Sequence, residues 1–169
     1  MNKFTEIAPE EIRDNPFRLI GQDWMLITAG NATAANTMTA SWGGVGVLWN
    51  APVSFCFVRP TRYTYPLMEN GRFYSLSFFD ASYRRVLQQC GTLSGRDGDK
   101  IARVGLTVRD DEQAPYFDES RLTLICRKMY DQDIDPTRFR DGTISVHYPQ
   151  EDYHRMYVGE IVKVLQRIN

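Results

Sequence analysis

Short apolar runs of β-forming residues recur along the chain, and turn-forming residues separate several of them. The segment PVSFCFVRP (52–60) has a proline at each end and a continuous apolar centre, which predicts a buried strand. Two earlier runs, DWMLITAG (23–30) and TMTASWG (37–43), predict strands joined by the turn NATAAN. Similar patterns predict further strands within 72–80, 119–134 and 155–168.

The helices that the sequence predicts are all short. They are TYPLMENG (64–71), ASYRRVLQQCG (81–91) and GDKIARVG (98–105). Strands joined by short helices, without a regular alternation of strand and long helix, predict a mainly β chain. We therefore expect an antiparallel barrel or an α+β fold rather than a doubly wound sheet. The 169 residues suit a single domain that covers 1–169, with no repeat or linker.

Composition argues against several classes of function. The 20 basic and 21 acidic residues give a formal net charge of −1, so we expect neither a nucleic-acid surface nor an anionic-membrane binder. Cys56, Cys90 and Cys126 are widely spaced, which predicts reduced thiols in a cytoplasmic protein rather than disulfides or a zinc site. The sequence shows no secretory signal and no apolar run that could span a bilayer, so we expect no membrane partner.

The glycine-rich stretch GGVGVLW (43–49) does not fit a dinucleotide-binding motif. Gly44 and Gly46 form a G-x-G, but Trp49 occupies the third glycine position and the segment NAPVSF follows instead of a helix. We therefore predict a glycine-rich turn with a structural role.

The two histidines make a weak case for a metal site. His147 and His154 are seven residues apart, with Asp152 between them, and an odd spacing on a strand would send them to opposite faces. We expect exposed or hydrogen-bonded histidines and no metal. The segment DYHRMYVGE (152–160) has two interpretations. Its aromatic and charged side chains are either ordinary exposed residues, or they form the wall of a cleft that offers an aromatic face and a cation.

The segment RPTRYTY (59–65) combines the features of an anion-binding turn. Its side chains supply two guanidiniums and several hydroxyls, and the N-terminal end of a predicted helix follows directly. A solvated basic loop explains this segment alone equally well. The candidate residues are Arg59, Thr61, Arg62, Tyr63 and Thr64.

The segment CGTLSGRDGDK (90–100) resembles a second such loop. Its glycines allow close approach of the backbone, and Ser94, Arg96 and Lys100 supply donors. Taken alone, this pattern favours a helix cap followed by a turn.

Four segments occur together and in this order: NTMTASW, FVRPTRYTY, SFFDASYRRVLQQCGTLSGRDGDK and HRMYVGEI. The set resembles the flavin reductase-like family, in particular the small bacterial branch that includes flavoredoxin-type proteins. The resemblance extends over nearly the whole chain, and Met-Thr-Ala-Ser-Trp and Arg-Pro-x-Arg-x-Thr are its most specific parts. It implies a six-stranded antiparallel split barrel of the FMN-binding type, a homodimer, and FMN bound near the subunit interface.

The resemblance also implies roles for individual residues. The strand 39–41 would line the isoalloxazine ring, the loop 59–64 would hold the phosphate and ribityl chain, and the segment 94–100 would close the pocket. The residues that it assigns to the cofactor are Thr39, Ala40, Ser41, Trp42, Arg59, Pro60, Thr61, Arg62, Tyr63, Thr64, Cys90, Ser94, Gly95 and Lys100.

Two side chains near this predicted pocket have more specific expectations. His154 lies where some relatives place a group near the nicotinamide, so it is the candidate catalytic residue. Strand alternation places Trp42 on the opposite face from Ser41, in the barrel wall or the dimer interface rather than stacked on the flavin.

The function implied by the resemblance is hydride transfer from NAD(P)H to FMN, with electrons passed onward. Flavin chemistry belongs to the cofactor, so the protein needs no acid–base dyad, which agrees with a sequence that has only two histidines. An alternative is an FMN-containing electron carrier that a redox partner protein reduces and that reacts little with NAD(P)H. A barrel-like interaction module without a cofactor would leave the two anion-suited segments unexplained.

Overall fold

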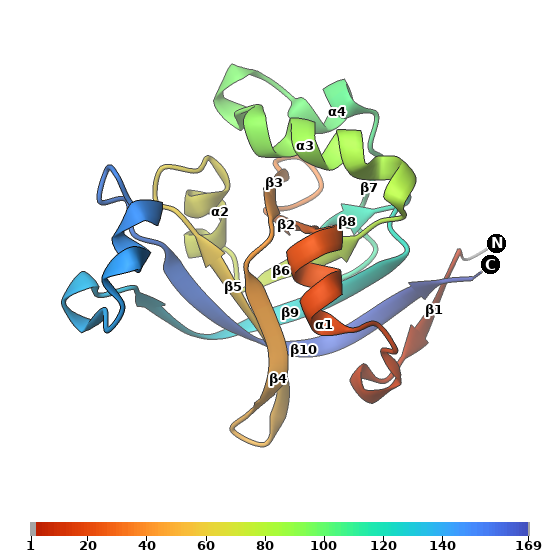
Figure 1. The fold of residues 1–169 in the computed structure, drawn as a ribbon. Helices are drawn as coiled ribbons and strands as arrows, with labels where there is room; N and C mark the ends of the chain where they lie inside the picture. The colour runs from red at the N-terminus through yellow and green to blue at the C-terminus, as the bar shows by residue number, and fades with distance from the viewer. Residues whose placement is uncertain (1–2, 169) are drawn as a thin grey trace.

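The computed structural model describes residues 3–168, and a twisted antiparallel sheet forms its centre (Figure 1). In sheet order, the main strands are β3 (Asn36–Ala40), β2 (Met25–Ala29), β6 (Phe73–Phe78), β9 (Leu122–Asp133), β10 (Arg155–Arg167), β5 (Ala51–Val58) and β4 (Gly43–Leu48). An eighth strand, β1 (Phe4–Ile7), pairs with the C-terminal end of β10. A separate two-stranded sheet contains β7 (Val108–Arg109) and β8 (Tyr116–Phe117).

The predicted mainly β fold with antiparallel strands and short helices is confirmed. Each of the six predicted strands has a counterpart in β2, β3, β5, β6, β9 and β10. The predicted number of six strands is too low, because the main sheet has eight strands within residues 3–168. The two additional strands, β1 and β4, are a four-residue strand and a glycine-rich strand, neither of which has a strong β pattern.

The predicted glycine turn at 43–46 is wrong. These residues begin β4, in which Gly43 pairs with Cys56 of β5 and Leu48 pairs with Ala51. The turn comes later, at Trp49 and Asn50, which have φ values of 51° and 59°. Two consecutive residues with positive φ are typical of a tight hairpin turn whose twist matches that of the strands. Glycine is depleted in strands, so composition suggested the turn too early.

Consecutive strands β3 and β4 lie at opposite edges of the sheet. Only residues 41 and 42 connect them, and the three Cα steps from Ala40 to Gly43 span at most about 11 Å. Seven strands in a flat sheet would place the two edges about 29 Å apart. The sheet must therefore roll until its edges approach each other, as in a split barrel.

The interior of the rolled sheet holds the main apolar cluster, which includes Met25, Ile27, Leu76 and Leu124. The strand β10 changes register at Val158/Gly159 and again at Ile161/Lys163. Such bulges bend a strand and increase its twist, so they help β10 to follow the curvature of the sheet.

The helices pack around this sheet. They are α1 (Pro16–Arg18), α2 (Thr64–Asn70), α3 (Arg84–Thr92) and α4 (Lys100–Val104), with the shorter helical elements η1 (Pro9–Glu11), η2 (Leu19–Asp23), η3 (Ala81–Tyr83), η4 (Gly95–Asp97), η5 (Pro136–Arg138) and η6 (Gly142–His147). Leu87 and Cys90 of α3 pack with Leu26 of β2 in a second apolar cluster. No helix within residues 3–168 is long and apolar enough to cross a membrane.

Substitution of Gly159 tests the tight packing inside the rolled sheet. A Cβ atom at Gly159 would lie 2.2 Å from the hydroxyl oxygen of Tyr74, which is fully buried. We expect Gly159→Ala to lower the free energy of unfolding in urea by about 1–3 kcal/mol, because the core must shift to admit the methyl group. Gly142→Ala is the control, since a Cβ there meets nothing within 4 Å. Equal losses in the two variants would contradict this account.

Candidate functional site

The first hollow lies where β3 ends and the chain crosses to β4. Its lining residues are Met38, Thr39, Ala40, Ser41, Trp42, Phe57, Arg59 and His154. Apart from Arg59 and His154, these side chains are apolar, aromatic or small hydroxyl groups. A flat polar group could therefore approach the backbone of residues 39–41 without meeting a long side chain.

Trp42 does not follow the strand alternation that the sequence predicted. The strand β3 ends at Ala40, so the alternation of faces stops before Ser41. Ser41 and Trp42 both line the first hollow. The indole ring of Trp42 lies edge-on to the ring of His147 and tilted toward that of His154, with centroids 5.2 Å away in each case.

His154 is a buried and neutral wall of the first hollow. Its Nδ1 atom lies 2.8 Å from the hydroxyl oxygen of Tyr148, and the residue is 7% exposed. Burial, assisted by the cation of Arg59, lowers the pKa of His154 to about 4. The imidazole is therefore uncharged at pH 7 and can form hydrogen bonds without adding positive charge.

The two histidines contact the same tryptophan and do not assemble a metal site. Within residues 3–168, no group of three or more His, Cys, Asp or Glu side chains is arranged to hold a metal ion.

Arg59 fastens the segment before β10 to the end of β5. It forms an ion pair with Asp152, with Nη1 2.6 Å from Oδ1, and its Nη2 donates to the carbonyl oxygen of His147 at 2.8 Å. Its guanidinium also lies 4.9 Å from the ring centroid of Tyr148. Because Asp152 balances its charge, Arg59 has a positioning role as well as a place in the first hollow.

The second hollow adjoins the first, since Met38 lines both. It lies between the loop after β5 and the loop after α3. Its lining residues are Met38, Thr61, Arg62, Tyr63, Thr64, Thr92, Leu93, Ser94, Gly95, Arg96 and Lys100. The structure thus brings together the two anion-suited segments that are about thirty residues apart in the sequence.

Two cations are held in the wall of the second hollow. Lys100 is 3% exposed, and its Nζ donates to the carbonyl oxygens of Cys90 and Leu93 at 3.1 and 3.0 Å. Both Nη atoms of Arg62 lie 3.1 Å from the carbonyl oxygen of Gly91. Neither cation forms an ion pair with a carboxylate of the described residues, so main-chain carbonyls at the C-terminal end of α3 are their protein partners.

The pKa values of these cations reflect the absence of a balancing carboxylate. Burial, together with the positive charge of Arg62, lowers the pKa of Lys100 to about 8. Burial and the cation of Arg59 lower the pKa of Arg62 as well. An anion in the second hollow would relieve this repulsion and favour both charged forms.

Close packing joins the two loops around the second hollow. A Cβ at Gly95 would lie 2.3 Å from the Tyr63 ring and 2.6 Å from the side-chain oxygen of Asn36, so only glycine fits. The Nδ2 atom of Asn36 donates to the hydroxyl of Thr64 at 2.7 Å. Arg96 donates from Nη1 to the carbonyl oxygen of Thr61 at 3.1 Å.

Two of the candidates from the sequence line neither hollow. Pro60 is exposed between the two groups of residues. The Cys90 side chain is buried beneath α3, where burial raises its pKa, and only its carbonyl oxygen reaches Lys100. Thr39 lies in the first hollow, and its hydroxyl donates to the carbonyl oxygen of Leu87.

Several residues of the site were not among the sequence candidates. Met38, Phe57 and Thr92 line the hollows, and Tyr148 holds His154. Met38 and Phe57 lie in predicted strands and resemble ordinary core residues. The sequence therefore contains no signal that would have distinguished them.

The structure is thus a rolled antiparallel sheet. The two adjoining hollows form one groove beside the crossing from β3 to β4, and the cations in its wall suit it to an anion. The family model for the flavin reductase like domain matches residues 17–168. The chain therefore belongs to the flavin reductase-like family, as the sequence motifs indicated. A comparison with curated protein sequences gives no significant match.

Solved structures with the same fold include proteins from several organisms. An FMN-binding domain of a flavin reductases-like enzyme from Shewanella baltica OS155 is similar with a TM-score of 0.71 and 14% identity, over 98% of this chain and 78% of that one. Flavoredoxin from Methanosarcina acetivorans has a TM-score of 0.65 and 24% identity, over 94% and 75%. An NADH:FAD oxidoreductase from Streptomyces globisporus C-1027, solved with NAD and FAD fragments, has a TM-score of 0.62 and 15% identity, over 85% and 74%.

Proposed function

We propose that this protein binds FMN across the two hollows and transfers hydride from NAD(P)H to the flavin. The observation that carries the proposal is the pair of cations Arg62 and Lys100, which have main-chain carbonyl partners but no carboxylate partner among the described residues. They lie beside the first hollow, where the charge of Arg59 is paired with Asp152. Membership of the flavin reductase-like family supports the cofactor. The NAD and FAD fragments named for the Streptomyces globisporus structure support a nicotinamide donor.

The second hollow fits the phosphate end of FMN. A buried ammonium and a guanidinium supply charge-assisted donors, which are the groups that bind phosphate best. The hydroxyls of Thr61 and Ser94 line the same hollow. Gly95 lets this loop pack directly against Tyr63 and Asn36, which holds the wall of the hollow in place.

The first hollow fits the ring end. Residues 39–41 present small side chains and main-chain groups that can hydrogen-bond a ring edge, and Trp42 and His154 form its walls. Bound FMN would supply the redox chemistry. The chain's own residues would hold the ring, keep water from it, and present a neutral imidazole at His154 on the side where a nicotinamide could dock.

Our second candidate is an FMN electron carrier that a partner protein reduces. The similarity to flavoredoxin from Methanosarcina acetivorans favours it. The two candidates share the flavin site and differ in whether nicotinamide reacts directly.

The purified protein should bind FMN stoichiometrically and oxidise NADH or NADPH faster than free FMN does. Absorbance at 340 nm under air measures this turnover, with an equal concentration of free FMN as the background. Stoichiometric FMN without turnover above that background would favour the electron carrier. An absence of FMN binding would refute both candidates.

The affinity for FMN should fall as the pH rises through about 8, because Lys100 loses its proton there. Lys100→Met should weaken FMN binding by about 1.5–3 kcal/mol and remove this pH dependence, since it deletes a charge-assisted bond to the phosphate. Flavin fluorescence titration measures both effects.

Two controls separate the phosphate from the ring. Riboflavin lacks the phosphate, so Lys100→Met should change its affinity much less than that of FMN. Arg103→Met removes an exposed cation from the same helix and should leave FMN affinity unchanged. Equal losses for FMN and riboflavin would disprove the phosphate role of Lys100.

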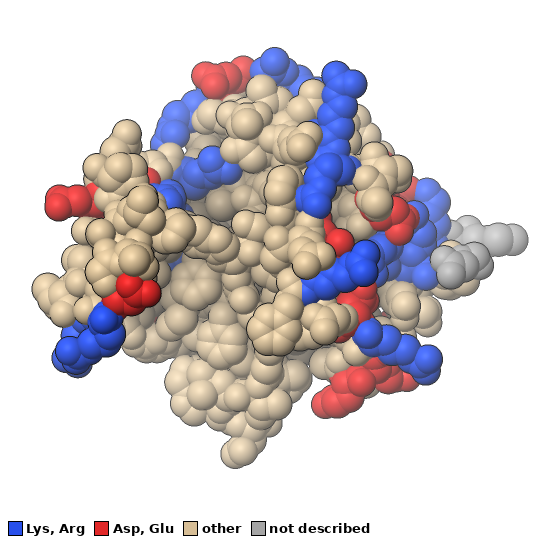
Figure 2. All heavy atoms as spheres, in the orientation of Figure 1, with Lys and Arg blue, Asp and Glu red and all other residues tan. Residues whose placement is uncertain are grey.

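We also propose that the protein is a homodimer that pairs through the edge strand β4. Residues 24–58 contain no Asp, Glu, Lys, Arg or His. In Figure 2, the visible part of the β4–β5 hairpin accordingly shows no charged side chain. Val47 and Trp49 of the hairpin are 78% and 57% exposed. Edge strands that face water are normally protected by charges or proline, so this uncharged edge suits a second copy of the same strand.

Light scattering should therefore give twice the 19.5 kDa mass of one chain. Val47→Lys should shift the protein toward the monomer, because edge pairing would place two lysines in an apolar contact. Val146→Lys changes an equally exposed valine on η6 and should leave the dimer intact. A monomeric wild-type protein would contradict the proposal.

A further inference from the structure

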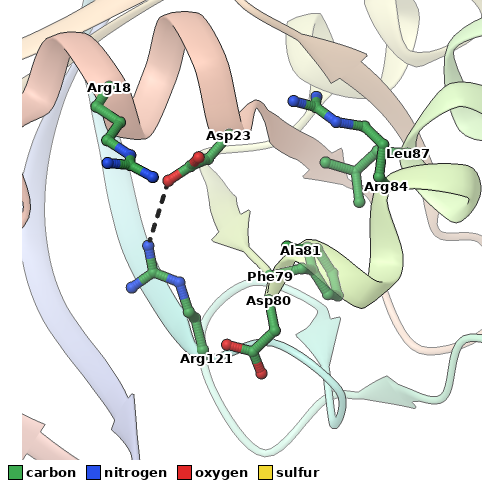
Figure 3. A pocket seen from close by; sticks show the side chains of 8 residues that line it. All are labelled: Arg18, Asp23, Phe79, Asp80, Ala81, Arg84, Leu87 and Arg121. Atoms are coloured by element: carbon green, nitrogen blue, oxygen red, sulfur yellow. Dashed lines mark ion pairs between the residues drawn. The ribbon is translucent and has the colours of Figure 1, made fainter.

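We propose a second ligand site, for a small organic monocarboxylate, in the hollow between η2, the start of α3 and the beginning of β9. We call it the arginine hollow. Its lining residues are Arg18, Asp23, Phe79, Asp80, Ala81, Arg84, Leu87 and Arg121. None of them lines the first or the second hollow. Figure 3 shows Arg18 and Arg121 on one side of the space and Arg84 with Leu87 on the other.

Arg84 is the most informative side chain of this hollow. Its guanidinium carbon lies 3.8 Å from the ring centroid of Trp24, and its Nη2 donates to the carbonyl oxygen of Gln22. Its Nη1 is buried and has no hydrogen-bond partner among the residues that the structure describes. A buried donor without a partner is costly and rare in native proteins, so the Arg84 guanidinium retains unused hydrogen-bonding capacity at the wall of the hollow.

The charges around the hollow favour a single negative charge. Arg121 pairs with Asp14 and Asp23 at 2.7 and 3.8 Å, and Asp80 pairs with Arg167 at 3.4 Å. Arg18 and Arg84 form no ion pair with any residue in the described range 3–168. Three guanidiniums and two carboxylates therefore line the hollow, and a monoanion would balance the difference.

The shape and floor of the hollow favour an apolar body behind that charge. The volume is about 210 Å³, and a cavity of about 150 Å³ is known to accept benzene. The side chains of Phe79 and Leu87 are buried at its base. A carboxylate can take two parallel bonds from a guanidinium, while the rest of the ligand packs on these two side chains.

The backbone of residues 19–24 has an unusual conformation that places the Trp24 ring against the Arg84 guanidinium. The segment η2 is a single π-helical turn, and Trp24 directly after it has a φ of 70°. Positive φ is rare for a bulky residue, and π-turns are frequent at functional sites. The Trp24 ring stacks on Arg84, so this strained turn fixes the guanidinium at the wall of the hollow.

Benzoate is the probe for this site, with side-chain and main-chain NMR signals as the readout. We expect saturable shifts of the Nε–H signals of Arg84 and Arg18 and of the amides of 80–84. Arg84→Gln and Arg18→Gln should each weaken benzoate binding by at least about tenfold. Arg18 is exposed, so its variant should fold normally even where Arg84→Gln loses stability.

Arg85→Gln is the matched control, because it removes an exposed arginine next to Arg84 on the same helix. It should leave benzoate affinity unchanged, and neutral benzamide should not bind. The proposal is overturned by an absence of shifts at Arg18 and Arg84, or by an equal loss in Arg85→Gln. Preference for inorganic phosphate over benzoate would overturn the carboxylate assignment. These outcomes do not depend on FMN binding.

Discussion

The two-residue connection between β3 and β4 is the constraint on which the rest of the structure depends. Because β3 and β4 lie at opposite edges of the sheet, residues 41 and 42 can join them only if the sheet rolls. The roll creates the enclosed apolar core, and it leaves a seam where regular strand pairing stops. The first hollow lies at this seam, so the candidate site is a direct consequence of the way the sheet closes.

Electrostatics in the groove depend on helix α3 in a similar way. Lys100 and Arg62 bond main-chain carbonyls at the C-terminal end of this helix instead of carboxylates. Carbonyl dipoles hold a cation in place, but they do not cancel its charge. The second hollow is therefore positive although the whole chain has a formal net charge of −1. The same helix begins at the arginine hollow, so its two ends border two different anion-suited sites.

Local sequence pattern is sufficient for some elements of this fold and misleading for others. The strand 52–60 and the helix 81–91 were predicted because apolar periodicity and flanking turn residues agree there. The strand β4 was missed because three glycines made it resemble a turn. Trp42 was assigned to the wrong face because strand alternation was extended beyond the end of β3. In both cases a rule of local geometry was applied where the tertiary fold changes the direction of the chain.

The sequence by itself determined the mainly β class, most of the elements and the two anion-suited segments, because these follow from residue type and short-range spacing. Only the tertiary structure decided which residues meet. It placed Arg62 beside Lys100, paired Arg59 with Asp152, and brought His147 and His154 to one tryptophan. It also exposed the edge of β4 and assembled the arginine hollow from segments about one hundred residues apart. Such contacts arise from long-range strand pairing and packing, which leave no periodic trace in the sequence.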